Sequence, residues 1–282
     1  MRRIFSVLLA IFTTFQLSAA LITVKEFSEL LKTDKDLVVV DCDRASNYAT
    51  SHIKGAINIF PQELFNGKPD GIFKSTDEMA KFFGSKGISE SSRIVLYDDG
   101  SNKYTSTIYF LLTYIGAKDV KIMTKVMAEF EKYRLPLTSA VTKINPVTFT
   151  PMVKTGCLIS IADFKAKQAA GSFLVIDTRK VEEYKGEDTD KKSKGHLPGA
   201  ISITYKDFLK TDGSFKEKAE IEALAAKHGA TTEKAIVIYC NSGVLASVGY
   251  YALHEILGYQ NVMVLEGGYN HWVLDASNTL EK

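Results

Sequence analysis

The stretch that decides the fold is AIVIY at 235–239, followed by CNSGVL at 240–245 and ASVGYYALHEIL at 246–257. The first run is apolar and rich in β-branched residues, which is typical of a strand buried on both faces of a parallel sheet. The third run has the length and composition of a helix. Cys240 therefore lies in a tight turn between a strand and a helix, where open α/β sheets form their binding sites.

The same arrangement occurs earlier in the chain, so the sequence contains a long, diverged internal repeat. Asp98 precedes Cys240 by the same interval as Gly116 precedes Gly258. The matching runs are Leu37–Asp41 with Phe173–Asp177, His52–Ile59 with His196–Ile203, and Ile94–Asp98 with Ile236–Cys240. Two copies of one domain explain this pattern better than chance.

Each copy alternates short apolar runs with helix-length segments, which predicts an α/β fold. We expect two domains, each an open, mainly parallel sheet with helices on both faces. Pro136 and Asn145-Pro146 lie in a stretch rich in Ser and Thr without sustained periodicity, which indicates an extended linker. The predicted boundaries are a first domain over 21–134, a linker over 135–153 and a second domain over 154–282.

The first twenty residues have the features of a secretory signal peptide. Arg2-Arg3 is a basic start, residues 4–17 are apolar and uncharged, and Ser18–Ala20 supplies small residues for cleavage. The apolar run is shorter than the roughly 20 residues of a membrane-spanning helix. We predict export to the periplasm or the outside of the cell, with residues 1–20 as the segment that meets a membrane. An uncleaved N-terminal anchor is the alternative.

Charge and cysteine content restrict the function further. Cleavage after residue 20 removes two of the 35 basic residues. Their number then equals the 33 acidic residues, and the net charge is zero. A neutral chain with interspersed charges gives no support to a nucleic-acid partner. The odd set of Cys42, Cys157 and Cys240 argues against a disulfide scaffold and leaves at least one thiol free. Cys42 and Cys157 lack a motif and are expected to be buried or incidental, with a regulatory disulfide as the alternative.

The turn at Cys240 suits a nucleophilic sulfur. Successive backbone N–H groups and the positive end of the following helix face a side chain in this position, and both stabilise an anion. We therefore expect the pKa of Cys240 to lie below its usual value of about 8.5. Gly243 allows the backbone turn that such a ring of N–H groups requires. Because the first copy has Asp98 at the matching place, the fold itself does not require cysteine there.

Four motifs carry a resemblance to a known family. They are Asp177-Thr178-Arg179 with Glu183-Tyr184, Gly195–Ala200, Cys240–Leu245, and Leu265–Gly268 followed by Trp272. With these, the sequence resembles the tandem-domain rhodanese family of thiosulfate and 3-mercaptopyruvate sulfurtransferases. The resemblance implies that Cys240 accepts a sulfane sulfur as a persulfide and passes it to a thiophilic acceptor such as cyanide, a thiol or an acceptor protein. It also implies a catalytically silent first copy and no cofactor or metal.

The resemblance further implies which residues contact the anionic sulfur donor. These are Arg179, Asn241, Ser242, Gly243, Val244 and Leu245. A surface salt bridge is the alternative role for Arg179. The loop is uncharged, which leaves thiosulfate and mercaptopyruvate both open as donors.

Three other functions are alternatives to a sulfurtransferase. A non-catalytic persulfide carrier would also need Cys240, and a purely structural pair of domains would not. A cysteine phosphatase would need an arginine where Ala246 stands. His52 and His196 recur at matching turns of both copies, so we expect a structural role for them and not general-base catalysis.

Overall fold

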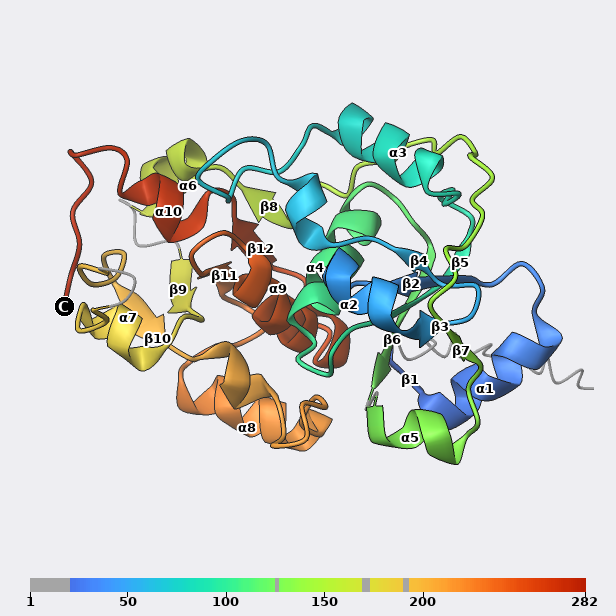
Figure 1. Cartoon of the computed structure of the whole chain (residues 1–282). Coiled ribbons are helices and arrows are strands. Elements are labelled where there is room, and N and C mark those ends of the chain that lie inside the picture. Colours follow the sequence, from blue (N-terminus) through green and yellow to red (C-terminus); the bar gives the residue numbers. More distant parts are fainter. Residues whose placement is uncertain (1–20, 125–126, 169–172, 190–192) are drawn as a thin grey trace, which may run out of the picture.

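The computed structural model describes residues 21–124, 127–168, 173–189 and 193–282 (Figure 1). The predicted signal peptide, residues 1–20, lies outside the described residues. Two α/β domains follow one another along the chain, and each is built on a five-stranded sheet whose neighbouring strands run parallel. The predicted fold class is confirmed.

The sheet of the first domain has the order β1-β6-β5-β2-β4. Its strands are β1 (Leu21–Thr23), β2 (Val38–Asp41), β4 (Ile57–Asn58), β5 (Arg93–Tyr97) and β6 (Asp119–Thr124). Its helices are α1 (Val24–Thr33), α2 (Ala45–Thr50), the 3₁₀ turn η1 (Pro61–Leu64), α3 (Thr76–Ser85), α4 (Lys103–Tyr114) and α5 (Met127–Lys132). A separate antiparallel pair joins β3 (His52–Ile53) to β7 (Leu137–Thr138).

The sheet of the second domain has the order β10-β9-β11-β12-β8. Its strands are β8 (Leu158–Ile159), β9 (Phe173–Asp177), β10 (Ala200–Ser202), β11 (Ala235–Tyr239) and β12 (Val262–Leu265). Its helices are α6 (Ile161–Gln168), α7 (Val181–Lys185), η2 (Tyr205–Phe208), α8 (Lys218–Lys227), α9 (Val244–Tyr250), the π-helix η3 (Tyr251–Ile256) and α10 (Gly268–Trp272). Among the described residues, no helix is both long enough and apolar enough to cross a bilayer.

Side chains alternate along the central strands because successive residues of a strand point to opposite faces. On β5, Ile94 and Leu96 belong to an apolar cluster with residues of α3 and α4, whereas Val95 and Tyr97 belong to a second cluster with residues of α1 and α5. Both faces of the sheet are therefore covered by helices. This explains why the strand sequences are almost continuously apolar.

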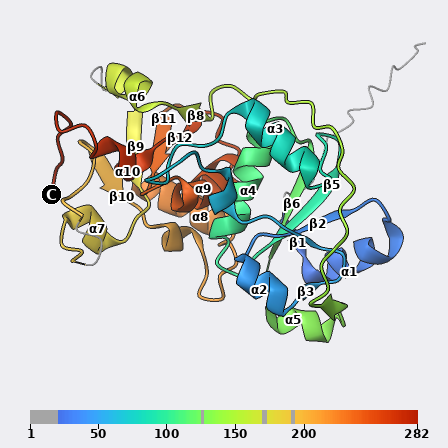
Figure 2. The ribbon, with the colours of Figure 1, turned by 45° about the horizontal axis from the view of Figure 1, so that its top comes forward.

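The two domains share one core. Helices α4 and α9 pack against each other between the sheets (Figure 1, Figure 2). The ring of Phe110 lies 4.9 Å from that of Tyr250, and the ring of Tyr109 lies 4.8 Å from that of Tyr251. A single buried apolar cluster runs through both domains at this joint. The turn before α9 is consequently enclosed by first-domain residues.

The predicted linker, residues 135–153, returns along the first domain. After β7, the N–H of Val147 donates to the Gly84 carbonyl at 2.9 Å, and the N–H of Met152 donates to the Ile115 carbonyl at 2.8 Å. A Cβ at position 84 would lie 2.5 Å from the Val147 oxygen, so only glycine allows this close approach. These contacts fix the path by which the chain enters the second domain.

Candidate active site

The candidate active site is the turn that joins β11 to α9. Cys240 follows β11 directly, and its side chain is buried, with 1% of its surface exposed. The N–H of Gly243 donates to Sγ at 3.1 Å, and the N–H groups of Ser242, Leu245 and Ala246 also lower the pKa of the thiol. Gly243 has a φ of 104°, a conformation that glycine adopts without strain. The expected ring of backbone donors is present.

The net effect on the Cys240 thiol differs from the expectation. Burial is the largest influence and raises its pKa above the ordinary value, while the N–H groups lower it by less. Desolvation penalises the anionic form, and here the shared core of the two domains excludes water from the sulfur. The prediction of a depressed pKa is therefore wrong for this structure. Burial thus favours the neutral thiol over the thiolate at Cys240.

The first domain holds a carboxylate in the matching ring of N–H groups. Asp98 follows β5 as Cys240 follows β11, and its two oxygens accept four backbone hydrogen bonds. The donors are Gly100 at 2.9 Å, Asn102 at 3.2 Å, Tyr104 at 3.2 Å and Thr105 at 3.3 Å. Burial raises the pKa of Asp98 to about 6, against the opposing effect of these donors. This turn of the fold therefore accommodates an anion.

Neighbouring residues hold the loop Cys240–Leu245 on two sides. The amide of Asn241 donates from Nδ2 to Oε1 of the buried Glu183 at 2.7 Å. The N–H of Tyr269 donates to the Cys240 carbonyl at 2.8 Å, and the N–H of Asn270 donates to the Asn241 carbonyl at 3.0 Å. Glu183 and the start of α10 thus fix the loop backbone around the sulfur.

The structure brings the predicted loop residues together around Cys240. Asn241, Ser242, Val244 and Leu245 are half-buried, and Val244 and Leu245 pack against the core that the two domains share. Contact of these residues with a sulfur donor stays a prediction.

Arg179 makes its hydrogen bonds to residues outside this loop. Its side chain is fully buried, and Nε and Nη2 contact the carboxylate of Asp177 at 2.6 to 3.0 Å. Nη1 donates to Ser193 Oγ at 3.1 Å, and Nη2 also donates to the Gly195 carbonyl at 2.9 Å. The guanidinium carbon lies 4.1 Å from the centre of the Tyr269 ring. These contacts fit the salt-bridge alternative, although the pair is buried and not on the surface; a contact between Arg179 and a donor stays a prediction.

The first domain contributes residues that the sequence reasoning missed. A Cβ at Gly243 would lie 3.1 Å from Cζ of Phe73, so the Phe73 ring lies against the loop Cys240–Leu245. The N–H of Phe73 donates to Glu266 Oε1 at 3.3 Å, and the N–H of Gly267 donates to the Gly71 carbonyl at 2.9 Å. No local pattern marks these residues, because Phe73 and Glu266 are 193 positions apart.

His52 and His196 make equivalent contacts in the two domains. The ring of His196 stacks on Tyr184 at 3.7 Å, and Nδ1 contacts the Tyr184 carbonyl at 2.9 Å. The ring of His52 stacks on Tyr48 at 3.6 Å, with Nδ1 2.6 Å from the Tyr48 carbonyl. These are the contacts expected of a structural turn.

Cys42 and Cys157 are both free and buried. Burial raises the pKa of the Cys42 thiol well above its usual range and that of Cys157 to about 11. Neither thiol has the ring of donors that surrounds Cys240.

Comparison with known protein families decides the relationship. The model of the rhodanese-like domain matches this chain twice, over residues 23–133 and 160–275. The chain belongs to the rhodanese-like domain family. Only the second rhodanese-like domain has cysteine at the turn after its central strand, since the first has Asp98.

Relatives of similar length share the tandem arrangement. A Haloferax volcanii protein provisionally named a thiosulfate sulfurtransferase is 28% identical over 244 residues, covering 84% of this chain and 85% of its own. A Thermus thermophilus protein named sulfur carrier protein TtuD is 29% identical over 257 residues, covering 86% of this chain and 87% of its own.

Solved structures share the fold at lower identity. The 3-mercaptopyruvate sulfurtransferase SseA of Escherichia coli superposes with a TM-score of 0.78 at 20% identity, over 89% of this chain and 99% of SseA. The anaerobic ergothioneine biosynthesis enzyme of Chlorobium limicola gives a TM-score of 0.85 at 20% identity, over 94% of this chain and 70% of its own.

We predict that Arg179→Ala lowers the free energy of unfolding by about 3 to 5 kcal/mol, because it leaves the buried carboxylate of Asp177 without its partner. Equilibrium urea unfolding measures this loss. The exposed Arg44 provides the control: its guanidinium carbon lies 5.6 Å from the centre of the Phe60 ring, and Arg44→Ala should lower stability by at most about 1 kcal/mol. A stable Arg179→Ala protein with a raised KM for the donor would instead assign Arg179 to donor binding.

We also predict that alkylation of Cys240 by iodoacetamide is slow at neutral pH. The rate constant should still be rising at a pH where that of the unfolded chain has levelled off, since the thiolate reacts and burial raises the pKa of this thiol above that of a free cysteine. Mass spectrometry of the Cys240 peptide gives the rate, and the urea-unfolded chain provides the reference. A folded-state rate that is already constant above pH 7 would contradict the raised pKa.

Proposed function

We propose that this chain is a sulfurtransferase that carries a sulfur atom on Cys240 as a persulfide, with a catalytically silent first domain. The observation that carries the proposal is the ring of backbone donors at Cys240, together with the carboxylate that the same ring holds at Asp98. Donors that accommodate an anion suit the terminal sulfur of a persulfide. The names of the Haloferax and Thermus relatives support the same chemistry.

The reaction has two displacement steps. The Cys240 thiolate attacks the outer sulfur of thiosulfate, a new S–S bond forms, and sulfite leaves with the electron pair of the broken S–S bond. A thiol, cyanide or acceptor protein then attacks the terminal sulfur, and the Cys240 thiolate departs with its electron pair. The N–H groups of Ser242, Gly243, Leu245 and Ala246 face the negative charge at the start of the first step and at the end of the second.

The donor in this proposal is thiosulfate or a similar small anion. The loop from Cys240 to Leu245 has no charged side chain, so backbone dipoles and not a fixed cation would attract the donor. Mercaptopyruvate remains the alternative donor on the same grounds. Ala246 occupies the position at which a cysteine phosphatase needs an arginine, which disfavours phosphate chemistry.

A persulfide carrier is the second candidate function. The raised pKa of the Cys240 thiol favours slow loading, and the Thermus relative is named as a sulfur carrier protein. Steady-state transfer of sulfur from thiosulfate to cyanide separates the two functions. A carrier would take up one sulfur atom per chain and show almost no catalytic turnover.

We further propose that the chain is exported and that residues 1–20 are its signal peptide. The support is the sequence of this segment, with Arg2-Arg3 before an apolar run and small residues at Ser18–Ala20. The mature N-terminus, determined by mass spectrometry of the protein from its native membrane and exported fractions, should be Leu21. An intact Met1 in the exported fraction would contradict cleavage.

We predict that Cys240→Ala reduces sulfur transfer to below about one thousandth of the wild-type rate, because the nucleophile is removed. Intact mass spectrometry after incubation with thiosulfate should show one added sulfur on the wild type and none on the variant. Cys157→Ala removes another buried thiol and should retain transfer. Sulfur loading of the Cys240→Ala chain would refute the assignment.

A further inference from the structure

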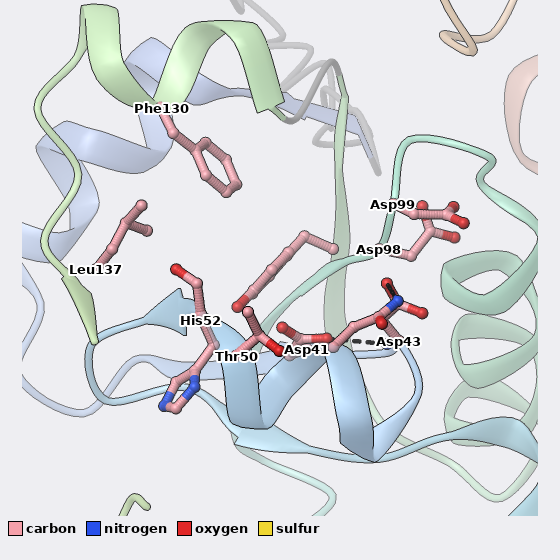
Figure 3. A pocket seen from close by; sticks show the side chains of 11 residues that line it. Asp41, Asp43, Thr50, His52, Asp98, Asp99, Phe130 and Leu137 are labelled. Atoms are coloured by element: carbon pink, nitrogen blue, oxygen red, sulfur yellow. Dashed lines mark hydrogen bonds between the residues drawn. The ribbon is translucent and has the colours of Figure 1, made fainter. Parts of the chain in front are cut away.

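The first domain contains a cavity at the place that matches the candidate active site (Figure 3). Its volume of about 340 Å³ lies within the range of small-molecule pockets, which is about 300 to 1,000 Å³. Carboxylates and apolar side chains share the lining with the polar residues Asn47, Thr50, Ser51 and His52. The carboxylates are those of Asp41, Asp43, Asp98 and Asp99, and the apolar contribution comes from Phe130 and Leu137.

The internal repeat shows what a carboxylate at this place binds. Asp41 ends β2 as Asp177 ends β9, and both side chains are buried. Each accepts the N–H of the residue two positions later at 2.9 Å, from Asp43 in one domain and from Arg179 in the other. Each also accepts a hydrogen bond from the tyrosine that ends the neighbouring strand. In the second domain, the remaining partner of the carboxylate is a guanidinium group.

Among its described residues, the first domain has no guanidinium or ammonium group in that role. The position that matches Arg179 is Asp43, and the cavity is lined by Asp41 and Tyr97, the counterparts of the Asp177 and Tyr239 that surround Arg179. Within the described ranges, no ion pair involves Asp41, Asp43 or the two aspartates that follow β5. The second domain therefore fills this space with its own cation, and the first leaves it open.

The electrostatics of the cavity favour a positively charged occupant. Burial raises the pKa of Asp41 against the smaller lowering effect of its hydrogen bonds from the Asp43 N–H and from Tyr97; the charge of Asp43 raises it further, and that of His52 lowers it. Burial likewise raises the pKa of Asp98, and the adjacent Asp99 adds to the effect. A cation that entered the cavity would relieve this repulsion and compensate buried charge.

We propose that this cavity binds a small organic cation with a guanidinium group, in which Asp41 holds the ligand as Asp177 holds Arg179. The planar guanidinium offers paired N–H donors that match a carboxylate and is more weakly hydrated than an ammonium group. Phe130 and Leu137 provide an apolar surface for an alkyl chain attached to it. Among the described residues, no group of three His, Cys, Asp or Glu side chains is arranged to hold a metal ion. An organic cation therefore fits better than a metal.

Isothermal titration of the full chain with agmatine, a guanidinium on an aminobutyl chain, tests the proposal. We expect saturable one-to-one binding, and binding at least about tenfold weaker for putrescine, which has no guanidinium group. A capped Gly-Arg-Gly peptide in a parallel titration distinguishes a free ligand from an arginine side chain of a protein. Binding of the peptide in place of agmatine would support the site and assign it to a protein partner. Absence of saturable binding for all three probes would overturn the proposal.

The variant Asp43→Arg gives the sharper test, because it supplies in the chain the guanidinium that the second domain has at the matching position. Agmatine binding should weaken at least tenfold, and the thermal midpoint should rise. Asp36→Arg makes the same change of charge at an exposed turn and should bind agmatine like the wild type. Asp99→Asn, at an exposed position of the lining, should weaken binding several-fold without filling the cavity. Equal affinity in Asp43→Arg and the wild type would overturn the proposed site.

This inference concerns the first domain and does not rest on the proposed sulfur transfer. Sulfur transfer by the Asp43→Arg chain, measured alongside the titration, separates the two proposals. Loss of agmatine binding with transfer intact is the expected result.

Discussion

The backbone N–H groups at the start of a buried helix impose the constraint on which both domains depend. These groups have no partner within the helix, and an unpaired buried donor is costly. Helices α4 and α9 pack against each other where the two domains meet, and the residue that opens the turn before each, Asp98 or Cys240, is buried, so the N–H groups that face it need an acceptor there. Asp98 supplies it with a carboxylate, and Cys240 supplies it with sulfur. The exchange of one acceptor for another converts a structural turn into a reactive one.

Burial works against the charge at both turns. The pKa of Asp98 rises to about 6, so this carboxylate still ionises at neutral pH. The pKa of a free cysteine already lies above neutrality, at about 8.5, and burial raises the pKa of Cys240 further. The N–H ring therefore does not by itself yield a resting thiolate. The same exclusion of water protects a persulfide, since hydrolysis and side reactions need access to the sulfur. Enclosure by the first domain thus disfavours the thiolate of Cys240. It also shields the terminal sulfur of the proposed persulfide from water.

The two copies have diverged by redistributing charge within one scaffold. In the second domain, Arg179 neutralises the carboxylate of Asp177 and occupies the space above it. In the first, Asp43 takes the matching position, and a cavity with several carboxylates remains. The first domain keeps the framework of this turn with Asp98 in place of a cysteine. The first domain also supports the second, because Gly71 and Phe73 contact the turn after β12, and Phe73 contacts the loop after Cys240.

The sequence alone determined the fold class, the repeat and the turn at Cys240, because apolar periodicity and glycine placement are local properties of the chain. It also located the ring of N–H groups, since a strand, a tight loop and a helix in succession leave few other arrangements. Three features depended on tertiary structure. The raised pKa of Cys240 follows from burial between two domains, the contact with Phe73 joins distant segments, and the pairing of Arg179 with Asp177 depends on how the side chain folds back into the core. Each of these features depends on which distant segments pack together and exclude water. The local sequence does not specify that packing.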